Sequence, residues 1–112
     1  MSLSLVKPYI QQFLIHYISK FEEVKIDVDS LILFGSHARG TAVLSSDVDI
    51  AVVMKEPLTS EERGHLRSLG EEVNDMIETN LFFTTRQAVE ESTQTFDTNK
   101  YIREEGIVIW PK

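Results

Sequence analysis

The chain has 112 residues, enough for one domain with its own hydrophobic core and too few for two ordinary domains. Hydrophobic residues make up 42% and charged residues 26%, which excludes a disordered chain, and the lack of cysteine excludes disulfides and thiolate metal sites. The 18 acidic and 11 basic side chains give a net charge of −7, so general nucleic-acid binding is not expected. We therefore expect a single domain over residues 1–112.

Neither a membrane span nor a secretory signal is evident in the sequence. The longest apolar runs are only a few residues, and residues 1–4 lack the charged start and apolar stretch of a signal peptide. We expect a cytoplasmic protein with no membrane partner.

The first predicted element is an amphipathic helix. Apolar residues recur at steps of three and four from Leu3 to Phe21, and Pro8 is tolerated only near the first turn of such a helix. Residues 24–30 mix charges and break this period, so the helix is expected to end there.

Two short strands are predicted on either side of a polar segment that contains glycines. The apolar run 31–34, stopped by Gly35, predicts a buried strand, and residues 47–54 predict a second one. Between them, Ser36 is a residue type favoured as a helix N-cap, so one short helical turn can begin there.

The rest of the chain predicts further helices alternating with strands. Pro57 ends the second strand, and residues 59–62 have the form of a capping box ahead of apolar residues at helical spacing up to Ile77. The following elements are a strand around 81–83, a helix over 87–92 that Thr85 can cap, a helix-compatible stretch over 96–105 and a strand over 107–110. The order α, β, turn, β, α, β, α, β indicates an α/β (α+β) fold, a small mixed sheet backed by helices.

The segment from Gly35 to Ile50 carries the residues with evident chemistry. Asp47 and Asp49 are two positions apart at the start of an apolar strand, so their carboxylates point to the same face. Two adjacent anions require a cation, and Mg²⁺ typically takes one or two carboxylates together with substrate phosphates. The alternative is a solvated strand end without a ligand.

The residues just before this pair are suited to a polyphosphate. Gly35 permits a close backbone approach, Ser36 offers a hydroxyl and an N–H at a helix start, and Arg39 offers a cation. A P-loop is excluded because no lysine follows Gly40.

The joint spacing is more informative than either part. A Gly-Ser pair follows a strand directly, and after ten residues an Asp-x-Asp opens the next strand. This arrangement resembles the signature of the polymerase-beta-like nucleotidyltransferase superfamily. The whole chain resembles a minimal nucleotidyltransferase (MNT) domain, a family often paired with HEPN-domain proteins in toxin–antitoxin modules.

The resemblance implies roles for individual residues, and with them a nucleotidyltransferase fold. Asp47 and Asp49 match the family's metal ligands and are the implied catalytic residues, while Gly35 and Ser36 match its phosphate-binding pair. Three further residues match common positions of the family's Gly-Ser-x-Ala-Arg-Gly and Ser-Asp-x-Asp segments and are candidate nucleotide-binding residues: Arg39, Gly40 and Ser46.

The family normally has a third carboxylate on the following strand, and this chain departs from that pattern. Alignment of residues 81–83 with the family's third strand puts Asn80 where an aspartate is expected. An asparagine can offer an oxygen to a metal but cannot accept a proton as a carboxylate does. Glu78 is the nearest catalytic candidate, and its alternative is a solvated position at the end of the preceding helix.

The resemblance implies a Mg²⁺-dependent nucleotidyltransferase that uses ATP and moves AMP to an acceptor hydroxyl, with a tyrosine of a HEPN toxin as the acceptor. The alternative is a catalytically weakened protein that neutralises its partner by binding. Transfer to a small molecule such as an aminoglycoside is less suited, because that family usually adds a helical substrate domain for which 112 residues leave no room. A homo-oligomer is also possible.

Overall fold

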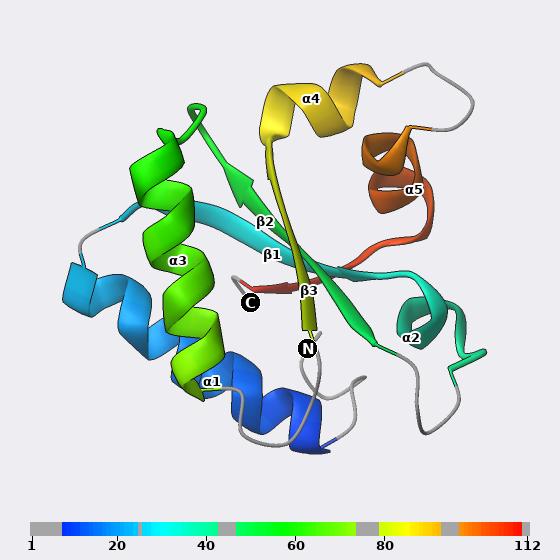
Figure 1. The fold of residues 1–112 in the computed structure, drawn as a ribbon. Coiled ribbons are helices and arrows are strands. Elements are labelled where there is room, and N and C mark those ends of the chain that lie inside the picture. Colours follow the sequence, from blue (N-terminus) through cyan, green and yellow to red (C-terminus); the bar gives the residue numbers. More distant parts are fainter. Residues whose placement is uncertain (1–7, 25, 43–46, 74–78, 93–96, 111–112) are drawn as a thin grey trace.

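A four-stranded mixed sheet forms the centre of the fold (Figure 1). The computed structural model describes residues 8–24, 26–42, 47–73, 79–92 and 97–110. The strands are β1 (Val28–Phe34), β2 (Val48–Met54), β3 (Thr79–Thr85) and β4 (Ile107–Trp110). Their order is β3-β2-β1-β4, with β2 and β3 parallel and β1 antiparallel to both β2 and β4. The predicted mixed sheet is confirmed.

The register of the sheet brings the end of β1 and the starts of β2 and β3 together at one end of the sheet. Phe34, the last residue of β1, pairs with Asp49 near the start of β2, and Asp49 pairs in turn with Asn80 near the start of β3. The turn that follows β1 therefore lies beside the first residues of β2 and β3.

Two long helices, α1 (Pro8–Val24) and α3 (Ser60–Val73), cover one face of the sheet (Figure 1). Their apolar sides form the larger core with alternate strand residues, of which Leu31, Ile50 and Ile109 are fully buried. The buried Tyr17 hydroxyl donates a hydrogen bond to the Leu66 carbonyl oxygen at 2.9 Å and so ties α1 to α3. Burial raises the pKa of this hydroxyl well above its ordinary value.

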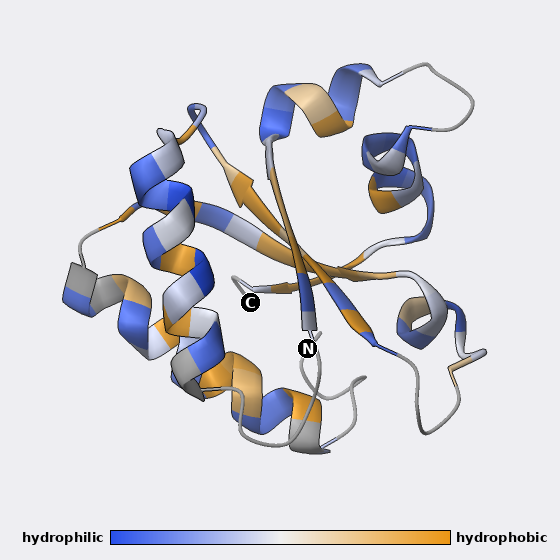
Figure 2. Cartoon of the chain, in the orientation of Figure 1, coloured by the Kyte–Doolittle hydropathy of each residue, from blue (hydrophilic) through white to orange (hydrophobic). Residues whose placement is uncertain are grey.

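The opposite face carries a smaller core under α4 (Arg86–Glu91) and α5 (Thr98–Glu105). Its buried members are Ile32, Ala51, Val53, Val89 and Ile102. The short helix α2 (Ser36–Arg39) sits at the sheet edge where the three strand ends meet (Figure 1). Figure 2 shows the hydrophobic residues concentrated on the strands and on the helix sides that face them. Polar and charged residues occupy the outer helix sides.

Local sequence signals account for several helix starts. The helix α1 begins at Pro8, the position at which its missing N–H costs least. The predicted capping box is confirmed, because the Glu62 amide donates to the Thr59 hydroxyl and the Thr59 amide donates to the Glu62 carboxylate, both at 3.1 Å. Thr85 caps α4 as predicted, accepting from the Ala88 amide at 3.1 Å.

Other boundaries differ from the prediction. Strand β1 begins at Val28, inside the segment whose mixed charges break the apolar period, and β3 extends on both sides of its apolar run to Thr79 and Thr85. The N-cap of α2 is Gly35, with Ser36 as the first helical residue, so the expected N-cap role of Ser36 is wrong. The predicted helical residues 3–7, 74–77 and 96 lie outside the described residues.

Within the described ranges, no helix combines the length and the apolar character that a membrane crossing requires.

Candidate functional site

Two aspartates and one asparagine meet where β2 and β3 begin. Asp47 directly precedes β2, and the register pairs Asp49 with Asn80 on the neighbouring parallel strand. The Asn80 Nδ2 atom donates to Asp47 Oδ2 at 3.2 Å and to Asp49 Oδ1 at 3.1 Å. The amide nitrogen thus lies between two carboxylates, which is where a cation would balance their charge.

Strand alternation explains why these side chains share one face. Val48 and Ile50 point into the larger core and are buried, so Asp47 and Asp49 project to the opposite face, as predicted from their spacing. Asp49 is half-buried, whereas Asp47 and Asn80 are exposed. The acidic pair is therefore fixed by the sheet and still open to a ligand.

Gly35 packs directly against Asp49. Its backbone has φ +74° and ψ −154°, a region that essentially only glycine adopts, and a Cβ atom at this position would lie 2.2 Å from Asp49 Oδ2. The close approach expected of this glycine is thus made to the Asp49 carboxylate. No residue with a side chain fits here without moving that carboxylate.

The turn after Gly35 is held by backbone hydrogen bonds. The Gly35 carbonyl oxygen accepts from the amides of Ala38 at 3.1 Å and Arg39 at 3.0 Å, which closes α2. Gly40 ends the helix in the left-handed conformation with φ +77°, and its amide donates to the Ser36 carbonyl oxygen. The short helix therefore begins beside Asp49, and the half-buried Ser36 occupies its first position.

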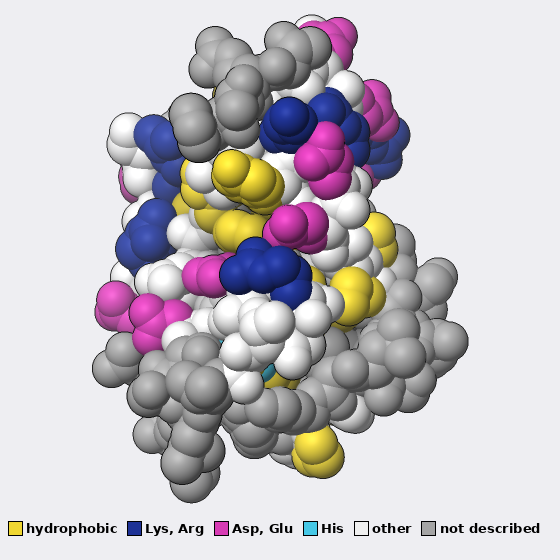
Figure 3. Space-filling model, turned by 90° about the vertical axis from the view of Figure 1, so that its right-hand side faces the viewer, with side chains coloured by type: hydrophobic (Ala, Val, Ile, Leu, Met, Phe, Trp, Pro, Cys, Tyr) yellow, Lys and Arg dark blue, Asp and Glu magenta, His cyan; other side chains and the backbone are white. Residues whose placement is uncertain are grey.

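Arg39 links this turn to α5. Its Nη1 atom lies 3.1 Å from Glu105 Oε2, and the side chains of the two residues are 48% and 34% exposed. Figure 3 looks onto this end of the fold, where acidic and basic side chains lie next to one another around exposed hydrophobic ones. The arginine is thus held near the site by a carboxylate and remains accessible to solvent.

A cavity of about 280 Å³ lies beside the acidic pair. Its lining comes from the end of β1, the α2 turn, β2 and α5: Phe34, Gly35, Arg39, Asp49, Thr98, Tyr101 and Glu105. The three α5 residues were not identified from the sequence. Their only signal is the spacing of 98, 101 and 105 on one helix side, which a solvated helix shows equally.

The structure brings most of the sequence-predicted residues together. Gly35, Arg39 and Asp49 line one cavity, and Asn80 joins Asp47 to Asp49. Ser46 and Glu78, predicted as a nucleotide-binding and a catalytic residue, lie outside the described residues. Within the described part of the chain, no three His, Cys, Asp or Glu side chains converge as a metal-binding group.

Comparisons with known proteins agree with this fold. Residues 14–110 match the family model described as Polymerase beta, Nucleotidyltransferase. A candidate nucleotidyltransferase from Sulfolobus solfataricus superposes with a TM-score of 0.59 at 17% identity, over 97% of this chain and 79% of that one. A crystal structure described as a toxin-antitoxin with AMP-PNP superposes with a TM-score of 0.56 at 22% identity, over 86% of this chain and 72% of that one. At such identities the two structures show a shared fold. A search of the curated proteins found no match.

Proposed function

Because the chain belongs to the polymerase beta nucleotidyltransferase family, we propose that it is a Mg²⁺-dependent enzyme that transfers AMP from ATP to an acceptor hydroxyl. The observation that carries this proposal is the meeting of Asp47, Asp49 and Asn80 at two strand starts, with Gly35 packed against Asp49. Two carboxylates fixed at the start of one strand, with an amide on the neighbouring strand and a glycine turn beside them, suit a metal–nucleotide complex.

The oxygen ligands for Mg²⁺ come from Asp47 and Asp49. Asn80 can add its amide oxygen, because rotation about its terminal torsion exchanges the nitrogen that now faces the carboxylates for the oxygen. The donor set is then all oxygen, which suits a hard cation that keeps several waters. When bound, Mg²⁺ supplies charge neutralisation at the phosphates and favours ionisation of the acceptor hydroxyl.

The triphosphate is proposed to lie over the α2 turn. Ser36 contributes its hydroxyl at the start of the helix, where an anion is favoured, while Arg39 contributes positive charge. Gly40 sets the end of the turn, and Ser46 is proposed to contribute at the start of the Asp47 segment. These groups are proposed to hold the phosphates in the orientation that turns the α-phosphorus toward Asp47 and Asp49.

The reaction forms one bond and breaks one bond. The acceptor oxygen bonds to α-phosphorus, the α–β phosphoanhydride bond breaks, and pyrophosphate leaves with the electron pair. The hydroxyl proton must pass to a base, and Asn80 cannot accept it. We assign that role to Glu78, and we expect transfer to be slow because the register position opposite Asp49 holds an amide.

The proposed acceptor is a tyrosine of a HEPN-domain toxin. Two observations support a toxin–antitoxin role: the resemblance to MNT domains, and the shared fold with a structure described as a toxin-antitoxin with AMP-PNP. The nucleotide analogue named for that structure also supports ATP as the substrate here.

A second function is favoured by Asn80 itself. With an amide in the third position, a protein of this family can retain nucleotide binding and lose transfer, and so neutralise its partner by contact alone. The net charge of −7 suits a basic partner surface.

Calorimetric titration with ATP, first with Mg²⁺ and then with EDTA, tests the nucleotide site. We expect binding only with the metal, and Asp49→Asn should weaken it, whereas Asp27→Asn removes the same charge from an exposed position outside the site and should not. Equal affinity in EDTA would contradict the metal site. Transfer of labelled AMP to the co-purified HEPN protein then separates the enzyme from the contact inhibitor.

A further inference from the structure

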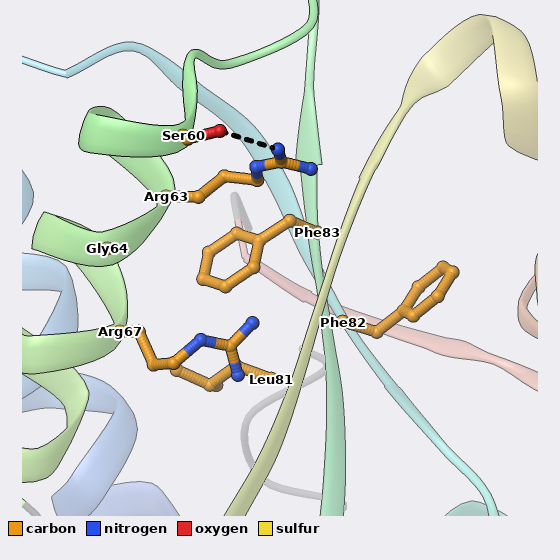
Figure 4. Close-up of a pocket in the computed structure, with 7 residues that line it drawn as sticks. All are labelled: Ser60, Arg63, Gly64, Arg67, Leu81, Phe82 and Phe83. Carbon is orange, nitrogen blue, oxygen red and sulfur yellow. Dashed lines mark hydrogen bonds between the residues drawn. The ribbon is translucent and has the colours of Figure 1, made fainter.

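A groove runs between α3 and the edge strand β3, on the sheet face opposite Asp49 and Asn80. Figure 4 shows its residues: Phe83 and Leu81 rise from β3 toward α3, and the Arg63 and Arg67 side chains reach over them from the helix. The cavity measures about 390 Å³. The groove is open to solvent, as expected for a peptide site rather than for an enclosed small-molecule pocket.

The groove continues along the strand beyond Phe83. A second hollow of about 100 Å³ shares Arg63 and Phe83 with the first and reaches Thr84 and Thr85. Together the two hollows follow β3 from Leu81 to Thr85, which matches the shape of an extended chain.

Two guanidinium groups define the chemistry of this groove. Arg67 lies over the Phe83 ring, with its Cζ atom 5.0 Å from the ring centre, and Arg63 donates to the Ser60 hydroxyl at 3.3 Å. Both arginines are exposed and stand one helical turn apart on the same side of α3. Within the described part of the chain, neither forms a salt bridge.

The other arginines of the chain already have carboxylate or backbone partners. Arg39 pairs with Glu105, and Arg86 pairs with Asp29 on β1. Arg103 donates to the carbonyl oxygens of Val89, Glu90 and Ser92. Arg63 and Arg67 therefore differ in having no carboxylate or carbonyl partner among the described residues, in a chain whose net charge of −7 disfavours anions overall. An acidic ligand is directed to this groove by that contrast.

The outer edge of β3 offers backbone groups beside these side chains. The strand lies at the end of the sheet, pairs only with β2 among the described strands, and contains no proline or charged residue over 79–85. Edge strands are usually protected by charges or proline, because free backbone donors and acceptors recruit a further strand. An extended peptide can add here by the same hydrogen bonding.

We propose that the α3–β3 groove docks an extended acidic segment of a partner protein, which adds to the edge of β3 and pairs its carboxylates with Arg63 and Arg67. The arginines give affinity for carboxylates that point to the α3 face, where Leu81 and Phe83 form the apolar floor. The alternate side chains of the segment then point to the opposite face of the sheet, the side toward which Phe82 points. The proposal uses none of the metal-site residues and therefore does not depend on nucleotide transfer.

A fluorescent heptapeptide that alternates Glu with Val is the probe, and its Gln–Val counterpart is the neutral control. We expect the acidic peptide alone to bind, and Arg63→Gln/Arg67→Gln to weaken it about tenfold or more, since two charge-assisted contacts are lost. Lys20→Gln removes a positive charge from α1, away from the groove, and should leave affinity unchanged. Hydrogen exchange of the β3 amides should slow when the peptide binds.

Three results would overturn the proposal: no binding of the acidic peptide, equal binding of the neutral peptide, or undiminished binding by the double arginine variant. Self-association in sedimentation that the same variant abolishes would assign the groove to a second copy of this chain instead. ATP titration of the same samples separates this failure from a failure of the proposed activity. Binding of the acidic and the neutral peptide to the wild-type protein tests the proposal even if a variant does not fold.

Discussion

At the scale of single residues, Asn80 is the group that donates hydrogen bonds to both members of the acidic pair. A carboxamide nitrogen has two hydrogens, and here they serve one carboxylate each, on Asp47 and Asp49. This arrangement gives the two anions a donor without giving the site a further negative charge. We therefore expect a lower affinity for a divalent ion than in a site with three carboxylates, because the amide supplies no charge.

Replacement of Asn80 by aspartate should make the site less stable without a metal ion and raise its affinity for one. We expect Asn80→Asp to lower the melting temperature in EDTA, because three carboxylates then repel one another, and to raise it when Mg²⁺ is added. Transfer of AMP should become faster, by at most about 10²–10⁴-fold, the usual contribution of a general base. Thermal denaturation with and without the metal measures the first effect, and labelled AMP incorporation measures the second.

Asn80→Ala is the matched control, because it removes both hydrogen bonds and adds no charge. If Asn80→Asp were no less stable in EDTA than Asn80→Ala, the proposed repulsion would be disproved.

Gly35 is the second residue on which the site depends. We expect Gly35→Ala to destabilise the fold by about 1–3 kcal/mol, the range for a residue forced into a sparsely populated backbone conformation. It should also weaken ATP binding, because the new Cβ would displace the Asp49 carboxylate. Urea denaturation and ATP titration measure the two effects separately.

Gly40→Ala controls for backbone strain alone. Its φ of +77° is also positive, but a Cβ there meets no atom within 4 Å. It should destabilise the chain, and at temperatures where it is folded it should weaken ATP binding less than Gly35→Ala does, because no carboxylate is displaced. Equal loss of ATP binding in both variants would contradict the role of the Gly35–Asp49 contact.

The acidic part of the site was predictable from the sequence, and its α5 wall was not. Alternation along a strand places Asp47 and Asp49 on one face whatever the rest of the fold does. Thr98, Tyr101 and Glu105 reach the cavity only because α5 packs on the sheet near the end of β1, and nothing in a short polar helix distinguishes that packing from solvation.

At the scale of secondary-structure elements, α3 shows how one helix tolerates two glycines for different reasons. A Cβ at Gly64 would meet no atom within 4 Å, whereas a Cβ at Gly70 would lie 2.9 Å from Leu81 Cδ1 on β3. Gly70 is also buried, and Gly64 is exposed. The first glycine is thus a weak point in the helix, and the second permits close packing of α3 on the sheet.

The two alanine substitutions should therefore have opposite signs. Gly64→Ala should raise the free energy of unfolding by about 0.5–1 kcal/mol, because alanine loses less conformational entropy in a helix. Gly70→Ala should lower it, because Leu81 must move away from the new methyl group. Chemical denaturation of both variants measures the difference, and stabilisation by Gly70→Ala would disprove close packing at that point.

Asp97 connects the ends of α4 and α5. Its carboxylate accepts from the Ser92 hydroxyl at 2.7 Å and from the Asn99 amide at 2.9 Å, and these bonds lower its pKa below the ordinary 3.8. A lowered pKa in the folded state means that the ionised form stabilises the fold above pH 3.8. This contribution is lost as the pH falls through the lower folded value.

We therefore expect the stability difference between the wild type and Asp97→Ala to be largest above about pH 4 and to shrink toward lower pH, as the wild-type carboxylate is protonated. Urea denaturation across that range measures it. A difference that is constant with pH would show that the charge of Asp97 contributes nothing to the cap.

Element boundaries were predictable where the signal is local. The capping box at Thr59 and Glu62 depends on four consecutive residues, so the sequence is sufficient to predict it. The early start of β1 involves distant partners, because Val28 pairs with Met54 on β2 and Asp29 forms an ion pair with Arg86 at the start of α4. Such a pair, 57 residues apart, leaves no local pattern in the segment that precedes Leu31.

At the scale of the whole molecule, the sheet is completed by the last strand in the chain. β4 pairs with β1 and occupies the edge opposite β3. Ile109 is fully buried in the larger core, whereas the neighbouring Val108 is 46% exposed. The core that supports α1 and α3 therefore depends on residues near the C-terminal end of the sequence.

Truncation of the Ile109 and Val108 side chains should show how much of the stabilisation by β4 comes from a buried side chain and how much from its backbone pairing. Ile109→Ala should destabilise the protein by about 2–5 kcal/mol, the usual cost of removing a large buried aliphatic group. Val108→Ala should cost well under half of that, because much of its side chain already contacts water. Thermal and urea denaturation provide the comparison, and similar losses would show that β4 contributes through its backbone alone.

The alignment of Asn80 with Asp49 across two parallel strands also bears on inheritance. In the genetic code, asparagine and aspartate codons differ by one base, A or G, at the first position. One transition mutation can therefore exchange the amide for a carboxylate at a place where the backbone register already aims it at the acidic pair. A single point mutation can therefore add a third carboxylate beside Asp47 and Asp49 without any change in the strands.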